Sequence, residues 1–231
     1  MLLLSVITIL FILYCSSESV ANVARHAGAK TQHFPLGLML SNQIYSLNRL
    51  NGFLIAPLLG LYVDKGGDEG SLKLFALIGC VVSGLMLAGL LRLWPFLLRI
   101  CTNLVLGIER DGFSFAALRG LLPRREGMNY GFANRKKDIL VIFGQSLTTS
   151  LAMPTAFILN LLAIRHPEYQ ATLVQSATVI SGVGNLVLNF YIFPKIALAE
   201  TRGQPDSIYH SIMLGKIFGI GVLSSCIIAI I

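Results

Sequence analysis

The sequence has few charged residues. Only 13% of its 231 residues are Asp, Glu, Lys or Arg, whereas 55% are hydrophobic. A soluble domain of ordinary composition carries about 25% charged residues. A chain this poor in charge cannot cover a surface that faces water, so we expect lipid to contact much of its exterior. The mean hydropathy of +0.73 agrees with this expectation.

Cysteine pairs and catalytic motifs are also missing. The four cysteines are far apart and include no C-x-x-C pair, which argues against a disulfide framework or a zinc site. The sequence contains no H-E-x-x-H, no G-x-S-x-G and no G-x-x-x-x-G-K-[ST] motif. We therefore predict a protein that is not an enzyme and that needs neither a cofactor nor a metal ion.

Apolar stretches long enough to cross a membrane follow one another along the chain. A helical crossing takes about 20 residues. The first stretch lacks the basic n-region and the cleavage site of a signal peptide, so we predict that it is retained as a span. The six predicted spans are residues 2–23, 34–61, 72–91, 139–164, 172–197 and 212–231. The predicted fold is an all-α, polytopic integral membrane protein, with residues 1–231 forming one membrane domain.

A long connection, residues 92–138, separates the third and fourth spans. Its first part gathers apolar residues on one helical face, with Trp94 at the edge of the span. This pattern is typical of an amphipathic helix that lies in the membrane interface. The rest is predicted to be a cytoplasmic basic loop whose charges set the topology and contact anionic lipid. Its basic residues include Arg124, Arg125, Arg135, Lys136 and Lys137.

Basic residues gather on one predicted side of the membrane. With the N-terminus outside, the inner connections hold thirteen Lys and Arg residues and the outer connections hold three. Such an excess marks the cytoplasmic side. Lys216, in the first turn of the sixth span, is expected to reach back to that side. The net charge of +7 is thus explained by topology. Basic and aromatic residues do not interleave as on a nucleic-acid surface, so we predict no nucleic-acid partner.

Polar residues recur at helical spacing inside three of the predicted spans. They are Glu18, Asn22 and Arg25 in the first, Asn42, Ser46 and Arg49 in the second, and Thr178, Gly182, Asn185 and Asn189 in the fifth. Ionisable groups at membrane depth cost at least about 2.5–3.5 kcal/mol each, so they usually face a partner or a cavity. Two interpretations stay open. The polar groups either pack helices, with Glu18 and Arg49 as a buried ion pair, or line a path for a substrate.

The charges within the spans favour an anionic headgroup over a cation. Arg25 and Arg49 suit phosphate because a guanidinium donates two hydrogen bonds in parallel. Amide side chains suit a sugar, whereas Glu18 is the only acidic residue within a predicted span and could also bind a proton or sodium. The candidate substrate-binding residues are Glu18, Arg25, Asn42, Arg49, Asn185 and Asn189.

Three stretches resemble the Amj-type family of lipid II flippases. Residues 24–31, A-R-H-A-G-A-K-T, are similar to that family's R-x-A-G-x-[KR]-T turn after the first span. Residues 48–60 resemble its second span, with Asn-Arg at the start and A-P-L-L-G at the end, and residues 166–172 resemble its P-E-Y-R-A-T segment. The likeness covers almost the whole chain. It departs at Gln170, where the family has arginine, and at Phe193, where the family has an acidic residue before the proline.

The resemblance implies a flippase of the bacterial inner membrane. Such proteins move lipid II, the undecaprenyl-diphosphate-linked peptidoglycan precursor, from the cytoplasmic to the outer face. Lipid II and membrane lipids are then the expected partners, with Arg25 and Arg49 at the motif positions. The residues alone leave other functions open: a transporter of another polyprenyl-phosphate lipid, a scaffold for cell-wall enzymes, or a membrane-embedded enzyme acting on such lipids.

Overall fold

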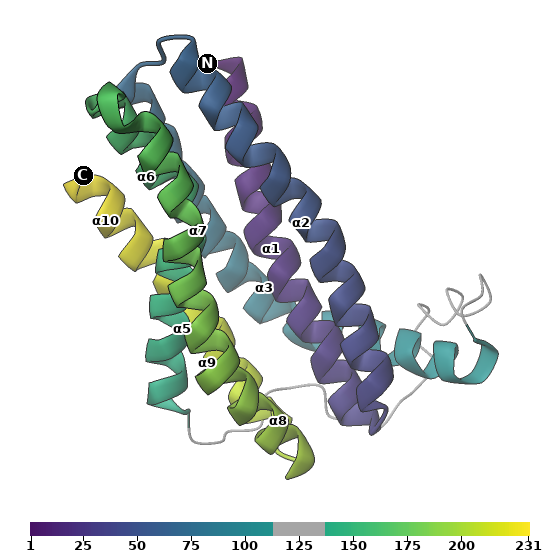
Figure 1. Ribbon diagram of the computed structural model, residues 1–231. Coiled ribbons are helices and arrows are strands. Elements are labelled where there is room, and N and C mark those ends of the chain that lie inside the picture. Colours follow the sequence, from purple (N-terminus) through teal and green to yellow (C-terminus); the bar gives the residue numbers. More distant parts are fainter. Residues whose placement is uncertain (113–136) are drawn as a thin grey trace.

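Long helices run between two ends of the molecule (Figure 1). The computed structural model describes residues 1–112 and 137–231, and these ranges contain helices and no strand. Both chain termini lie at one end, which we call the outer end in keeping with the predicted orientation (Figure 1). The opposite end, the inner end, carries the turn between the first two helices. The predicted all-α fold is confirmed for the described residues.

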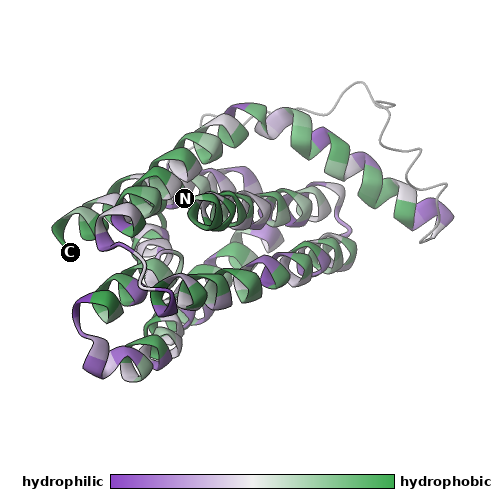
Figure 2. Cartoon of the chain, turned by 90° about the horizontal axis from the view of Figure 1, so that it is seen from above, coloured by the Kyte–Doolittle hydropathy of each residue, from purple (hydrophilic) through white to green (hydrophobic). Residues whose placement is uncertain are grey.

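Three continuous helices form the first half of the chain. They are α1 (Leu2–Thr31), α2 (Phe34–Asp64) and α3 (Glu69–Asp111). Helix α1 ends at Gln32, whose φ of 63° is left-handed, and Pro35 follows in the first turn of α2. Helix α1 packs against both α2 and α3 and lies between them when the molecule is viewed from above (Figure 2).

The helices of the second half are interrupted. They are α5 (Ile139–Ala152), α6 (Thr155–Arg165), α7 (Gln170–Val187), α8 (Phe193–Thr201), α9 (Pro205–Phe218) and α10 (Ser225–Ile230). Helices α5 and α6 are bent by 43° at Pro154, where a proline removes a backbone hydrogen bond. The π-helical turns η3 (Leu188–Ile192) and η4 (Gly219–Ser224) join α7 to α8 and α9 to α10. Each predicted span in this half therefore contains a break or a π-turn.

Two glycine pairs let helix backbones approach closely. Near the inner end, a Cβ built on Gly37 of α2 would lie 2.5 Å from the Cα of Gly28 in α1. Between α3 and η4, a Cβ on Gly84 would lie 2.7 Å from the Cα of Gly221. Such distances leave no room for a side chain, so these positions fix where the helices cross.

The structure supports four or five candidate membrane spans. Four helical runs are long and apolar enough to cross a membrane: Leu2–Thr31, Glu69–Asp111, Pro167–Thr201 and Pro205–Ile230. The bent pair α5–α6 qualifies as a fifth if it is one span. The predicted second span, residues 34–61, is helical as α2 but is not among them. Apolar residues predominate along the helices in Figure 2, as expected for a multi-pass membrane protein.

Helix α3 changes the predicted division between the third span and the connection. No break separates residues 72–91 from the residues that follow, because α3 continues for 43 residues through Pro95 to Asp111. At 1.5 Å per residue this helix is about 65 Å long, which exceeds a hydrocarbon core of about 30 Å. Its last turns reach the α1–α2 connection, where Glu109 lies 3.0 Å from His33. The basic loop predicted at Arg124 and Arg125 lies outside the described residues.

Side-chain contacts define the starts of two helices and join the outer connections. Asp68 accepts a hydrogen bond from the Ser71 N–H at the start of α3, and Asp138 accepts one from the Val141 N–H at the start of α5. At the outer end, Arg165 pairs with Glu69 at 2.6 Å. These contacts bring the α2–α3 and α6–α7 connections together, on the side opposite the α1–α2 turn.

Candidate functional site

The buried side chains of α1 are more polar in the inner half of the helix than in the outer half. In the outer half, Leu4, Ile7, Phe11 and Cys15 are apolar and at most 1% exposed. Phe11 packs edge-to-face on Phe157 of α6, with ring centroids 5.2 Å apart. From position 18 onward the buried residues of α1 include the polar side chains of Ser19, Asn22 and His26 beside small apolar ones such as Ala24 and Ala27. The outer half of this seam is therefore dry, and the inner half holds the polar contacts described next.

Glu18 begins the polar half and pairs with Lys216 of α9. The Lys216 ammonium lies 2.6 Å from Glu18 Oε1, and the side chains are 2% and 14% exposed. The expectation that Lys216 reaches back to the inner side is wrong, because its ammonium is held in the interior. The interpretation that Glu18 and Arg49 form a buried ion pair is also wrong, because Glu18 pairs with Lys216 instead.

Arg25 pairs with a carboxylate from α8. Its Nε and Nη2 donate to the two oxygens of Glu200 at 3.0 and 3.1 Å, which is a bidentate contact. The hydroxyl of Tyr209 donates to Glu200 Oε1 at 2.5 Å. The guanidinium carbon also lies 5.8 Å from the ring centroid of Phe193. Arg25 is therefore compensated in this structure, and it can bind an anionic ligand only by exchanging Glu200 for it.

The next turn of α1 makes a second contact with the α9 segment. The Asp206 Oδ1 lies 3.0 Å from the Lys30 ammonium and 2.9 Å from the Nε2 of His26. The indole N–H of Trp94, which can only donate, points at the other ring nitrogen of His26 at 3.2 Å. His26 is therefore neutral, with its proton on Nε2, and it stacks on Tyr209 at 4.6 Å. Lys30 supplies the positive charge opposite Asp206.

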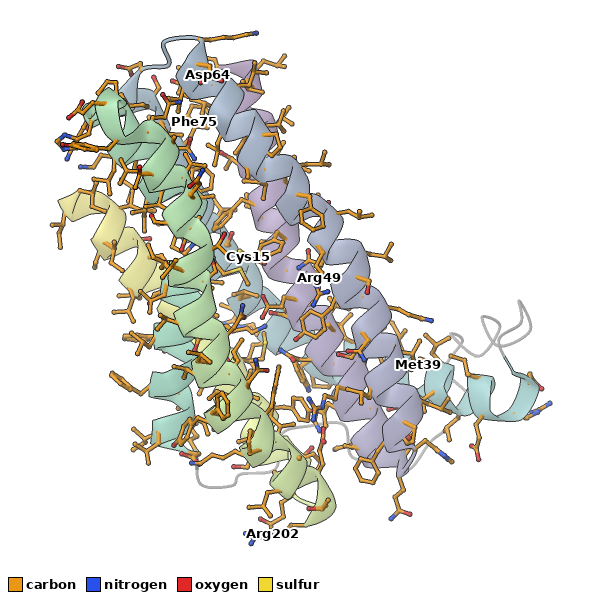
Figure 3. The ribbon with its side chains drawn as sticks, viewed as in Figure 1. Cys15, Met39, Arg49, Asp64, Phe75 and Arg202 are labelled. Carbon is orange, nitrogen blue, oxygen red and sulfur yellow. The ribbon has the colours of Figure 1, made fainter. Side chains whose placement is uncertain are left out.

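Arg49 lies about midway along α2 and is exposed (Figure 3). Within residues 1–112 and 137–231 it forms no ion pair and no hydrogen bond. Its neighbour Asn48 is buried and donates to the Tyr14 carbonyl at 3.0 Å, which turns this part of α2 toward α1. Arg49 thus presents a guanidinium beside exposed Leu50 and Phe53.

Asn42 borders a shallow depression along α2. The depression has a volume of about 700 Å³. Among the described residues, its lining comes from one face of α2: Pro35, Leu38, Met39, Asn42, Gln43, Ser46 and Leu47. At 3.6 residues per turn, Asn42, Ser46 and Arg49 lie along the same stripe. Polar and cationic groups therefore follow one line on the exposed face of α2.

Asn185 and Asn189 lie apart from the other candidates. Both are exposed on the run formed by α7 and η3, which packs against α5 and α6 rather than against α1 or α2. The packing uses Gly184, where a Cβ would lie 3.4 Å from the carbonyl of Thr148. The structure thus brings Glu18 and Arg25 into one charged seam, places Asn42 and Arg49 on one face of α2, and leaves the α7 asparagines separate.

The carboxylates and the lysine that complete the seam were not predicted from the sequence. Glu200 and Asp206 flank the α8–α9 turn, and Lys216 lies three turns further on. The sequence did contain an indication of these pairs, because Glu200 and Asp206 lie close to a predicted inner connection, at the same end as Arg25 and Lys30. Only the packing of α9 against α1 shows that they meet.

A small cleft at the inner end contains a further ion pair. It has a volume of about 210 Å³ and is lined in part by Asp138, Lys195, Arg202 and Ser207. Lys195 lies 2.7 Å from Asp138. Partial burial raises the pKa of Asp138, but hydrogen bonds from Lys195 and from the Val141 N–H outweigh it and hold the pKa below its ordinary value. No group of three or more His, Cys, Asp or Glu side chains within the described ranges could hold a metal ion.

Comparisons with known proteins add no family assignment. No protein-family model matches the chain, and no curated protein or solved structure matches it significantly. The described residues form a helical protein whose four or five candidate spans are compatible with a multi-pass membrane protein.

Proposed function

We propose that this chain is a flippase of the bacterial inner membrane that moves lipid II from the cytoplasmic to the outer face. The observation that carries the proposal is Arg49, an exposed guanidinium midway along a helix of a membrane bundle with no carboxylate partner among the described residues. In the predicted second span, residues 34–61, a charge at this position costs at least about 2.5–3.5 kcal/mol unless it is compensated. An anionic substrate supplies that compensation.

The surroundings of Arg49 suit a headgroup that carries both phosphate and sugar. The guanidinium can donate two parallel hydrogen bonds to a diphosphate. Asn42 and Ser46, on the same face of α2, offer amide and hydroxyl groups to a sugar. Exposed Leu50 and Phe53 leave this face open to the bilayer, so a polyprenyl tail can stay in lipid while the headgroup moves. Asn185 and Asn189 join this path only if α7 moves toward α2.

The membrane potential favours export. A unit charge that crosses the membrane gains or loses about 2.3 kcal/mol per 100 mV, and the cell interior is negative. An anionic headgroup is therefore driven outward along a polar path. The choice of lipid II over another polyprenyl-phosphate lipid rests on the resemblance to the Amj-type family, with Arg25 and Arg49 at its motif positions.

Replacement of Arg49 tests this proposal. In a host depleted of its own lipid II flippases, we expect the wild-type chain to restore growth and to expose lipid II at the outer face. The R49A variant should lose both effects because the diphosphate loses its partner. Lys65→Ala is the matched control, since Lys65 is an exposed cation at the outer end of the same helix. Membrane levels of each variant are measured by immunoblot.

The same assay separates the alternatives. Normal rescue by R49A at normal membrane levels would contradict the proposed role of Arg49. Failure of the wild-type chain on lipid II, with transfer of another polyprenyl-phosphate lipid, would identify a different transporter. A scaffold for cell-wall enzymes predicts that growth recovers without any change in lipid exposure, and a membrane-embedded enzyme predicts a chemically altered lipid.

A further inference from the structure

Two ion pairs close the inner end of the seam between α1 and the α8–α9 hairpin. They are Arg25–Glu200 and Lys30–Asp206, and together we call them the inner-end latch. Both cations come from α1, and both carboxylates flank the turn between α8 and α9. The Glu18–Lys216 pair lies deeper in the same seam. Cations thus follow one another inward along the seam, each opposite a carboxylate.

The carboxylates of the latch occupy the positions that phosphate oxygens would take. Glu200 accepts two hydrogen bonds from Arg25 in the forked arrangement that a phosphate also accepts. Asp206 offers one oxygen to the point charge of Lys30 and to the His26 N–H. An anionic group with two phosphates has enough oxygens to replace both carboxylates.

The depth of the latch suits a lipid phosphate. Helix α1 ends at Thr31, and at 1.5 Å per residue Arg25 lies about 9 Å and Lys30 about 2 Å from that end. The polar headgroup regions of a bilayer add about 10–15 Å in total to a hydrocarbon core of about 30 Å. With the end of α1 placed at the surface of the inner leaflet, Lys30 lies at the headgroup level and Arg25 near the boundary with the hydrocarbon.

The α8–α9 hairpin that carries the carboxylates has a glycine turn at its tip and a π-turn where α8 joins α7. The turn contains Gly203 at a φ of 65°, and Arg202, Gly203 and Gln204 are exposed. The π-turn η3 precedes the nine residues of α8, and π-turns within helices are frequent at functional sites. The latch side chains keep partial contact with solvent, with exposures between 9% and 19%.

We propose that a diphosphate-bearing headgroup enters from the inner leaflet by displacing Glu200 from Arg25 and Asp206 from Lys30, which releases the α8–α9 hairpin. The inference deepens the proposed function and rests on it, because it identifies where the headgroup is first bound. Arg25 and Lys30 receive the phosphates, and Lys216 is the next cation along the seam. In the empty protein the carboxylates hold the seam shut.

Inorganic pyrophosphate provides the test. Its dissociation constant is measured on the full chain in lipid nanodiscs at constant ionic strength. The internal carboxylate competes with the ligand, so removing its charge raises the fraction of protein that can bind. We expect Glu200→Gln to lower the dissociation constant about tenfold. The control is Glu69→Gln, which breaks a similar Arg–Glu pair at the outer end and should leave the dissociation constant unchanged.

The outcomes separate this inference from the proposed function. The E200Q gain must disappear in the double variant R25Q/E200Q, and D206N must show a gain of its own through Lys30. If E200Q folds and binds pyrophosphate with unchanged affinity, the latch proposal is overturned. If E200Q does not fold, unchanged pyrophosphate affinity in D206N overturns the proposal. Either result leaves the lipid II rescue assay standing. Conversely, normal rescue by R49A overturns the proposed role of Arg49 without altering a pyrophosphate result.

Discussion

At the scale of single residues, replacing Lys216 measures how much its buried ion pair with Glu18 contributes to the stability of the protein. The Lys216 side chain is 2% exposed, and its ammonium lies 2.6 Å from Glu18 Oε1. Removing one partner of a buried ion pair leaves the other charge uncompensated and costs about 3–5 kcal/mol. We therefore expect Lys216→Met to lower the unfolding temperature of the detergent-solubilised protein clearly, as measured by the intrinsic fluorescence of Trp94 and by circular dichroism.

The double variant is the control for that measurement. E18Q alone should destabilise by a similar amount, whereas E18Q/K216M removes both charges and should recover most of the loss, because neither charge is then left buried without its partner. Additive losses in the double variant would show that the two residues act separately, which the contact between them does not allow.

The candidate site could be predicted residue by residue, but its pairings could not. The i, i+4, i+7 spacing identified Glu18 and Arg25 as members of one buried face, and the structure places both in the seam. Spacing along one helix contains no information about its partner, so Lys216 and Glu200 were missed. The grouping of the α7 asparagines with Arg49 was an assumption about tertiary packing, and α7 packs elsewhere in this structure.

At the scale of elements, the α1–α2 hairpin depends on a contact between two glycines. A Cβ on Gly37 would meet the backbone of Gly28 at 2.5 Å, and backbone cannot move aside as a flexible side chain can. We expect Gly37→Ala to separate the two helices near their turn and to destabilise the protein by about 1–3 kcal/mol, the usual cost of overpacking. Thermal unfolding of the purified protein measures the effect.

Gly60 on the same helix gives the comparison. A Cβ there meets nothing within 4 Å. Alanine is the better helix former by about 1 kcal/mol, so Gly60→Ala should be neutral or stabilising. Equal destabilisation by the two substitutions would show that glycine content in α2, rather than the close approach at Gly37, determines the stability of the hairpin.

The helices were more predictable than their interruptions. Each predicted span lies within a helix or a run of helices, because long apolar stretches have few alternatives in lipid. Pro154 indicated the bend between α5 and α6. Neither π-turn, Leu188–Ile192 or Gly219–Ser224, contains a proline, although Pro194 follows the first, and both lie against α5, where Gly144 faces Ile192 and Gly219 faces Thr149. The continuity of α3 past Pro95 was likewise not apparent from composition.

At the scale of the whole molecule, the two ends should face opposite sides of the membrane. Lys65 lies in the α2–α3 connection at the outer end, and Arg202 lies in the α8–α9 turn at the inner end (Figure 3). In a background without the native cysteines, we expect Lys65→Cys to react with a membrane-impermeant maleimide in intact cells. Arg202→Cys should react only after the membrane is permeabilised.

Labelling of both cysteines in intact cells would contradict this arrangement, because it would place the two connections on the same side. The reverse pattern would invert the protein and move the inner-end latch to the outer leaflet. The predicted orientation follows from the excess of basic residues in the inner connections, of which residues 113–136 lie outside the described structure.

The apolar outer half of the α1 seam has a consequence for the energy supply of the cell. Buried charges such as Glu18 and Lys216 attract water molecules. A continuous chain of water molecules across the bilayer would conduct protons. The buried apolar side chains of Leu4, Ile7, Phe11 and Cys15, with Phe11 packed on Phe157, would interrupt such a chain of water. We therefore expect that, in a membrane, the protein holds these charged groups without conducting protons along this seam.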